Sequence, residues 1–387
     1  MTAVLMVLAI VLGLPGLATA LHLTSLAVAS MFYREARTPA SRVLRFCTLI
    51  PAYNEELVIG ATLAAVNADR RPDDLVIVIA DRCTDATAEI ARLHGAVVLE
   101  RPPGSEPGRA AARQDGLQYA LELPWDALAW IDADSIIEPG FYDACERVLV
   151  AGAPAVQARS EAARGTGLVD QATLASFALQ GVTIPRGRDR LGLLVRLRGT
   201  GMVVMREIAE RPHRFRAAAS EDLWYSLDLC LAGIRPRHVE TARLRSQNAG
   251  DWKAAKSQRE RYEAGRTSAA KAFAAPLLRR HDAASLEAAM FLLTPPFAVA
   301  VVSVLLGLGA ALLAGWGLGT VIAAAGLAAL TFVLVVGLIQ ARVGWRTWAA
   351  LAAAPWYLMW KVPVQIKAMA GTRTQKVYGA TPREHVS

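Results

Sequence analysis

Long apolar runs lie at both ends of the chain, and a central part between them has short apolar runs interrupted by polar segments. Residues 1–32 are almost uncharged, and this run exceeds the roughly 20 residues that a helix needs to cross a bilayer. The run has no basic start and no clear small-residue cleavage site. We therefore expect a retained transmembrane helix over residues 1–33 rather than a signal peptide.

The apolar pattern near the other end predicts a transmembrane hairpin over residues 286–341. Runs at Ala288–Ala314 and Leu318–Ile339 are separated by the short sequence GWG. Arginines follow the first and the last of the three runs, at Arg34, Arg37, Arg42, Arg45, Arg342 and Arg346. Because basic residues beside membrane segments stay in the cytoplasm, the central part is expected on the cytoplasmic side.

A further segment, residues 345–370, is rich in Trp and Ala but carries Lys361, Pro363 and Lys367. Such a segment is either a fourth membrane span or a helix that lies in the membrane interface. The tail at residues 371–387 is basic and is expected in the cytosol, which favours the interfacial helix.

The pattern between residues 44 and 280 predicts one cytosolic α/β domain. Apolar runs of four to eight residues, such as LVIVIA at Leu75–Ala80, alternate with stretches of helical character. The alternation indicates βαβ units, and continuous apolar runs indicate a mainly parallel sheet that is buried on both faces. One of the helices is expected to begin after Thr84 as its N-cap and to stop at Gly95.

Composition and charge agree with a membrane protein that has a cytosolic domain. The chain is 54% hydrophobic with a net charge of +8, and much of the positive surplus lies next to the apolar runs, where it would meet anionic headgroups. No basic-aromatic stripe suggests nucleic-acid binding. The four cysteines have no paired spacing, so reduced thiols are expected.

Polar residues follow three of the predicted strands at the point where each strand ends. They are Asn54, Asp81 and the pair Asp132 and Asp134 in the sequence WIDADS. In a parallel sheet these ends meet at one edge, where α/β proteins bind their ligands. The first strand is not followed by the glycine fingerprint of dinucleotide binding, and the chain has no phosphate-binding loop of the Walker type.

The pair of aspartates is a candidate metal site. Two carboxylates one residue apart repel each other unless a cation lies between them. Mg²⁺ and Mn²⁺ prefer carboxylate oxygens and commonly keep water and substrate phosphates as further ligands. A strand that simply ends in a polar turn remains the alternative.

The order of these motifs resembles that of the membrane-anchored, inverting family 2 glycosyltransferases, which have a GT-A fold and belong to the superfamily of the cellulose and hyaluronan synthases. IPAYNEE (50–56), ADRCTDATAEIA (80–91), DAD (132–134) and SEDLWYSLDLCLAG (220–233) match in order. The resemblance implies that Asp222 is the catalytic base and that a divalent metal lies at Asp134 and Asp132. It also implies nucleotide-sugar contacts from Pro51, Tyr53, Asn54, Glu55, Asp81, Arg109, Asp132 and Asp134. Ordinary capping of a helix by Ser220 and Glu221 is the alternative for the last motif.

A further match is partial. Polymer-making members of this family carry Gln-x-x-Arg-Trp on an interfacial helix, and here the sequence QRERY places Gln258, Arg261 and Tyr262 at these positions. With Glu221, the resemblance gives these residues a role at the acceptor and the diphosphate. The Tyr in place of Trp favours the addition of a single sugar over processive synthesis. A solvated, charged helix is the alternative for this stretch.

The expected function is therefore the transfer of a sugar from a nucleotide donor, expected to be a UDP-sugar, to a lipid, lipid-linked or polysaccharide acceptor. The reaction would take place at the cytoplasmic face of the cell (inner or plasma) membrane with Mg²⁺ or Mn²⁺. Other subunits of envelope biosynthesis are possible partners. Two alternatives stay open: a processive polysaccharide synthase, and a non-catalytic nucleotide-binding membrane scaffold.

Overall fold

The computed structural model describes residues 1–35, 43–162, 165, 167–211, 220–246 and 252–369, and these form two compact units. The helical unit is built from residues within 1–33, 164–191 and 258–374, and the sheet unit from residues within 34–163 and 192–257. The range 44–280, predicted as one domain, is thus divided between the two units. The predicted tail at 371–387 lies outside the described residues.

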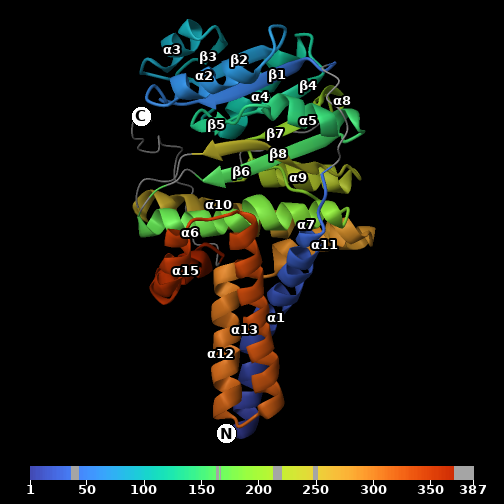
Figure 1. Cartoon of the computed structure of the whole chain (residues 1–387), viewed down its shortest axis with the longest axis vertical. Coiled ribbons are helices and arrows are strands. Elements are labelled where there is room, and N and C mark those ends of the chain that lie inside the picture. Colours follow the sequence, from blue (N-terminus) through green and yellow to red (C-terminus); the bar gives the residue numbers. More distant parts are fainter. Residues whose placement is uncertain (36–42, 163–164, 166, 212–219, 247–251, 370–387) are drawn as a thin grey trace. The chain divides into compact units, whose positions relative to one another are not determined.

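The sheet unit contains one eight-stranded sheet in the order β3-β2-β1-β4-β7-β6-β8-β5 (Figure 1). The strands are β1 (Phe46–Ala52), β2 (Leu75–Asp81), β3 (Val97–Arg101), β4 (Ala127–Trp130), β5 (Ser135–Ile137), β6 (Ala155–Ala162), β7 (Met202–Met205) and β8 (Arg237–Ser246). The first four strands are parallel, as predicted. β7 runs antiparallel to both β4 and β6, and β5 runs antiparallel to β8. Strand direction could not be predicted there because an apolar run does not encode it.

Helices cover both faces of this sheet. They are α2 (Ile59–Asp69), α3 (Thr87–Leu93), α4 (Arg109–Leu121), α5 (Phe141–Val150), α8 (Arg206–Ala209) and α9 (Glu221–Leu231). One core contains buried residues of α2, α3 and α5, and a second core contains buried residues of α4, α8 and α9.

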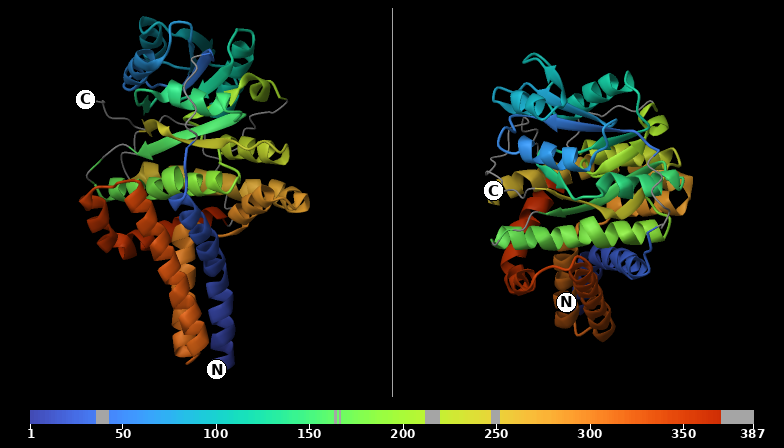
Figure 2. Two further views of the ribbon diagram at one scale, coloured as in Figure 1. Left: turned by 45° about the vertical axis from the view of Figure 1, so that its right-hand side comes forward. Right: turned by 45° about the horizontal axis from the view of Figure 1, so that its top comes forward.

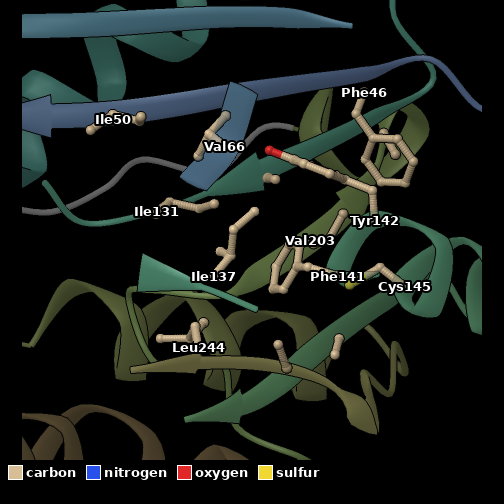
Figure 3. Close-up of a cluster of buried hydrophobic side chains, with 14 of the residues drawn as sticks. Phe46, Ile50, Val66, Ile131, Ile137, Phe141, Tyr142, Cys145, Val203 and Leu244 are labelled. Atoms are coloured by element: carbon tan, nitrogen blue, oxygen red, sulfur yellow. The ribbon is translucent and has the colours of Figure 1, made fainter. Parts of the chain in front are cut away.

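The continuous apolar runs of the central strands arise because successive side chains point into different cores. In β1, Phe46 and Ile50 belong to the first core, and Cys47 and Leu49 belong to the second. Figure 3 shows Phe46 and Ile50 in the first core, with Tyr142 of α5 beside the ring of Phe46. The prediction of a sheet that is buried on both faces is therefore confirmed.

The turn after β2 differs from the prediction. Helix α3 begins at Thr87 with Ala86 at the N-cap, so Thr84 is not its cap. The N–H of Thr84 instead donates to Oδ1 of Asn54 at 2.8 Å, which ties this turn to the one after β1. The predicted stop at Gly95 is confirmed: it follows the last turn of α3 with a positive φ of 75°.

The helical unit consists of α1 (Thr2–Met31), α6 (Leu168–Phe177), η1 (Ala178–Thr183), α7 (Ile184–Arg190), the larger part of α10 (Trp252–Arg280), α11 (Ala283–Leu293), α12 (Phe297–Leu313), α13 (Gly317–Gln340), α14 (Trp345–Ala350), η2 (Leu351–Ala353) and α15 (Ala354–Met369). Among the described residues, α1 and α13 are long and apolar enough to cross a membrane. Helices α11 and α12 meet the same test only together, and they are bent by 69°.

The hairpin prediction assumed one straight helix over Ala288–Ala314. The structure instead divides this run between α11 and α12. Pro295 and Pro296 follow α11, and proline disfavours the continuation of a helix before it. The last carbonyl groups of α11 have no N–H partner within the helix. Arg266 of α10 donates to the carbonyl oxygen of Phe291 at 2.7 Å and also to that of Thr294. Arg266 thus supplies hydrogen bonds to carbonyl groups at the break between α11 and α12, within the helical unit.

Helices α1, α12 and α13 lie side by side (Figures 1 and 2). Small residues allow α1 and α12 to approach closely, since a Cβ added at Gly16 would lie 2.5 Å from the carbonyl oxygen of Ala300. The hydroxyl of Ser303 accepts from the N–H of Gly16 at 3.1 Å and donates to the carbonyl oxygen of Leu12. Polar side chains of this kind pair the backbone groups that a proline such as Pro15 leaves open in an apolar helix.

Candidate functional site

The carboxyl ends of β1, β2 and β4 meet at one edge of the sheet. The register pairs Ala52 with Ala80 and Leu49 with Trp130. Asn54, Asp81 and Asp132 therefore follow three neighbouring strands at the same edge, as the sequence pattern predicts.

Two arginines of α4 bind the first aspartate of the DAD turn. Nη1 of Arg109 lies 3.1 Å from Oδ2 of Asp132, and Nη2 of Arg113 lies 3.2 Å from Oδ1. The N–H of Asp132 donates to the hydroxyl of Thr200 at 3.1 Å. These contacts hold the Asp132 carboxylate from both sides, so positive charge compensates its repulsion with Asp134.

The second aspartate of the turn is followed by a buried serine. Asp134 is half-buried, and the hydroxyl of the buried Ser135 donates to its Oδ1 at 3.4 Å. Among the described residues, no group of three or more Asp, Glu, His or Cys side chains is arranged to hold a metal ion. A cation at the DAD turn would therefore take part of its ligands from a bound substrate and from water.

The first turn of α9 carries Glu221 and Asp222. Ser220 occupies the N-cap position, as the capping alternative assumes, but makes no side-chain capping hydrogen bond. Oε1 of Glu221 accepts from Nη1 of Arg113 at 3.0 Å, which connects α9 to the DAD turn through one guanidinium group.

Asp222 is half-buried beside this ion pair. Oδ1 of Asp222 accepts from the N–H of Leu223 at 2.8 Å. Burial raises the pKa of the Asp222 carboxyl above its ordinary value, and the negative charge of Glu221 raises it further, while Arg113 acts in the opposite direction. A carboxylate with a raised pKa is a better proton acceptor near neutral pH than an exposed aspartate.

The segment before β7 passes close to both groups. A Cβ added at Gly199 would lie 3.2 Å from Nη2 of Arg113 and 3.6 Å from Oδ2 of Asp222. Gly199 and Gly201 have φ values of 67° and 68°, which favour glycine. The backbone of this segment therefore approaches both charged groups closely.

Asp81 is buried and lies in an ion-pair network. It is directly opposite Arg101 in the register of β2 and β3, and Nη1 of Arg101 donates to its Oδ1. Nη2 of Arg82 donates to Oδ2 of Asp81 at 3.2 Å, and the guanidinium of Arg82 lies 5.3 Å from the ring centre of Tyr53. Arg82 therefore connects Asp81 with Tyr53, two of the residues predicted to contact the nucleotide sugar.

The turn after β1 is fixed by hydrogen bonds to the turn after β2. Asn54 has a positive φ of 53° and accepts from Thr84 as described above. The N–H of Glu55 donates to the hydroxyl of Thr87 at 2.8 Å. Pro51, within β1, is half-buried. The turn of the IPAYNEE motif thus lies at the same edge as Asp81.

The QRERY stretch lies on α10, in the part that belongs to the helical unit. Arg261 is exposed and Tyr262 is half-buried, whereas the side chain of Gln258 lies outside the described residues.

Sequence reasoning missed four residues that contact Asp81 or Asp132: Arg82, Arg101, Arg113 and Thr200. Arg113 could have been found from its spacing, because it lies four residues after Arg109 and therefore on the same face of a helix. Arg82 directly follows Asp81, its ion-pair partner. Arg101 and Thr200 have no local signal, since their contacts depend on the register of β2 with β3 and on the course of the chain before β7.

The fold matches that of a solved glycosyltransferase. The structure of a mannosyltransferase from Pyrobaculum calidifontis, in complex with GDP-Man and Mn²⁺, matches with a TM-score of 0.57 at 15% identity over 95% of this chain and 98% of that chain. Glucosyl-3-phosphoglycerate synthase from Mycobacterium tuberculosis gives a TM-score of 0.40 at 21% identity over 58% of this chain and 78% of that chain.

Sequence comparison leads to the same group of enzymes. A 4,4'-diaponeurosporenoate glycosyltransferase of Staphylococcus aureus (strain USA300) is 31% identical over 118 residues, which are 28% of this chain and 30% of the relative. The match thus spans less than a third of the relative's length. The family described as "Glycosyltransferase like family 2" matches residues 45–265, which is more than half of the chain. With the predicted motifs in order and the same fold, the chain belongs to glycosyltransferase family 2.

Proposed function

We propose that the protein transfers a sugar from a nucleoside-diphosphate sugar to a lipid or lipid-linked acceptor at the cytoplasmic face of a membrane, with inversion at the anomeric carbon. The observation that carries this proposal is the bridge from the DAD turn through Arg113 to the first turn of α9. This bridge brings a candidate leaving-group site and a candidate base into one cluster.

Asp222 is the proposed base. An inverting displacement needs a group that takes the proton of the acceptor hydroxyl while the hydroxyl oxygen attacks the anomeric carbon. Asp222 lies in the first turn of α9, where the helix dipole stabilises its ionised form, and its raised pKa improves it as a proton acceptor. After the transfer, the proton would reside on the Asp222 carboxyl and pass to water.

Donor binding is assigned to the edge of the sheet. Tyr53 and Asp81 would contact the base, and the turn with Pro51, Asn54 and Glu55 would line the nucleoside. The guanidinium of Arg82 would have to leave the face of Tyr53 for a base to stack there. Arg109 has a side chain that is 37% exposed, and it would pair with a phosphate of the donor while Asp132 contacts the ribose or the metal. A UDP-sugar remains the expected donor.

A divalent cation fits the proposed diphosphate site. Asp134 carries the second carboxylate of the DAD turn, and both oxygens of Asp132 accept from arginines. We assign Asp134 as the principal protein ligand of Mn²⁺ or Mg²⁺, with Asp132 as the second candidate. The cation would neutralise the charge that develops on the departing diphosphate.

The acceptor is assigned to the membrane because of the apolar helices of the helical unit. A soluble sugar acceptor would not require helices of membrane length. The Tyr at position 262 supports the addition of one sugar over processive synthesis. Arg261 is assigned to the diphosphate and Tyr262 to the acceptor, with Gln258 as a further contact.

The last described helix is proposed to lie in the membrane interface. Helix α15 has 16 residues, fewer than the roughly 20 that a span needs. Trp356 and Met359 are 67% and 72% exposed, while Gln365 is buried and donates to Glu263 at 2.7 Å within the helical unit. Exposed Trp and Met beside Lys361 and Lys367 are typical of a helix at the level of the headgroups.

This arrangement predicts the membrane topology. In a background with Cys83 replaced by Ser, the variant Leu313→Cys places a thiol at the turn between α12 and α13, and Arg346→Cys places one in α14, beyond the other end of α13. A membrane-impermeant maleimide should label the first variant in intact spheroplasts and the second only after lysis, because Arg346 follows the span on the basic, cytoplasmic side. Labelling of Arg346→Cys in intact spheroplasts would place the sheet unit outside the cytoplasm.

The proposed reaction predicts metal-dependent release of a nucleoside diphosphate. Purified protein in nanodiscs of phosphatidylethanolamine and phosphatidylglycerol would be given a panel of UDP- and GDP-sugars with Mn²⁺, with Mg²⁺ or with EDTA. One donor should be consumed with either metal and spared with EDTA. Release of the β-anomer from an α-linked donor, read by NMR, would support inversion. Nucleotide binding without release from any donor would instead favour the non-catalytic scaffold.

A further inference from the structure

Arg113 has no role in the mechanism above, although it lies at the centre of the cluster. Its side chain is 0% exposed, whereas that of Arg109, one helical turn earlier, is 37% exposed. A bound diphosphate could therefore contact Arg109 but not Arg113. Because burying a guanidinium is costly unless its N–H groups are paired, the partners of Arg113 indicate what it does.

The partners of Arg113 come from three separate segments of the chain. Nη1 lies 3.0 Å from Oε1 of Glu221 in α9, and Nη2 lies 3.2 Å from Oδ1 of Asp132 in the DAD turn. Nη2 also donates to the carbonyl oxygen of Gly199 at 2.6 Å. The guanidinium lies 5.6 Å from the ring centre of the buried Trp130, the last residue of β4. One rigid planar group thus connects the leaving-group side of the site with the base side.

We propose that Arg113 is a positioning residue that fixes the first turn of α9 relative to the DAD turn, so that the carboxylate of Asp222 is aligned with the bound donor. The inference rests on the proposed glycosyl transfer. A lysine cannot replace Arg113 in this role, because a single ammonium nitrogen lacks the planar fork that reaches Glu221 and Asp132 at the same time. Misplacing a catalytic group by about 1 Å can lower a rate by about 100-fold.

The charges around Asp222 give the proposal a second readout. The groups that face it are Glu221 on the same helix, Arg113 and Arg109 on α4, and the N–H of Leu223; Asp132 shares both arginines. Besides the effect of burial, Glu221 raises the pKa of Asp222, and the two arginines lower it. Removing the charge of Arg113 should therefore raise this pKa further, and removing the charge of Glu221 should lower it.

The experiment compares Arg113→Lys, Arg113→Gln and Glu221→Gln with the wild type in the nanodisc assay, using the donor that the wild type consumes. Arg92→Gln, which removes an exposed arginine of α3, is the matched control. The readouts are kcat, the donor KM and the acidic limb of the pH profile of kcat. Thermal unfolding and metal-dependent nucleotide binding report whether each variant is folded.

Arg113→Lys should lower kcat by about 10- to 100-fold, with the donor KM changed by less than about threefold and the acidic limb unmoved, because the charge remains. Arg113→Gln should lower kcat and move the acidic limb to higher pH. Glu221→Gln should move the limb to lower pH. If Arg113→Gln does not fold, the lower kcat with an unmoved limb in Arg113→Lys and the lowered limb in Glu221→Gln still test the proposal.

Wild-type kcat and pH profiles in folded Arg113→Lys and Glu221→Gln would overturn the inference and leave the proposed function intact. A loss that appears only in the donor KM would also overturn it, because Arg113 would then act in binding the donor. Absence of release by the wild type from every donor would instead remove the proposed function, and the positioning role with it.

Discussion

Replacing Asp222 with Asn should abolish sugar transfer while nucleotide binding is retained. The substitution keeps the size of the side chain but removes the group that accepts the proton, and the loss of a general base typically lowers a rate by about 10²- to 10⁴-fold. A 10³-fold loss corresponds to about 4 kcal/mol of transition-state stabilisation. The donor affinity should change by less than about twofold, because Asp222 is assigned to the acceptor side.

The control for this variant is Asp228→Asn on the same helix. Six residues separate the two aspartates, so they lie on different faces of α9, and Asp228→Asn should keep nearly full activity. If Asp222→Asn were as active as Asp228→Asn, the assignment of the base would be wrong. A parallel loss of nucleotide binding in Asp222→Asn would show instead that the carboxylate supports the donor site.

The same residue determines the expected pH dependence. Only the ionised form of Asp222 accepts a proton, so kcat should fall as the pH drops through its pKa. Burial and the charge of Glu221 raise this pKa above the ordinary value of 3.8. We expect an acidic limb above the normal range of an aspartate, and that limb should be absent from the residual rate of Asp222→Asn. A flat profile down to the ordinary range would contradict the assignment.

Replacing Asp134 with Ala should remove the metal dependence of donor binding and of transfer. Asp134 is assigned as the principal protein ligand of the cation, and loss of a group that stabilises developing charge typically costs about 10²- to 10³-fold in rate. In contrast to Asp222→Asn, this variant should bind the donor weakly, with the same affinity in Mn²⁺ as in EDTA. Isothermal titration with the nucleoside diphosphate in both conditions measures this directly.

Glu138→Ala is the matched control for Asp134→Ala, because it removes a nearby carboxylate that pairs with Arg245 rather than facing the arginines of α4. It should keep the response to Mn²⁺. If Asp134→Ala still responded to Mn²⁺ and Asp132→Ala did not, the metal would be held by Asp132. In that case the cation would have to displace Arg109 and Arg113 from that carboxylate.

The sequence alone determined the central α/β fold and the positions of most candidate site residues. Strands that are buried on both faces must be apolar at nearly every position, so the runs around Ile50 and Val78 were visible without a structure. Once those strands are parallel, their polar C-terminal residues, such as Asp81 and Asp132, must share one edge. The helix with Arg109 and the one with Asp222 were also visible from local patterns.

Only the tertiary structure decided which of these side chains contact one another and how the pKa of a site carboxyl is shifted. The pairing of Arg113 with Glu221 joins residues that lie 108 positions apart in the chain, and no local spacing encodes such a contact. The pKa of Asp222 depends on how much water its neighbours exclude. Likewise, only the structure shows that Arg266 pairs carbonyl groups at the break between α11 and α12, because an apolar run does not reveal whether its backbone groups pair within one helix or with another side chain.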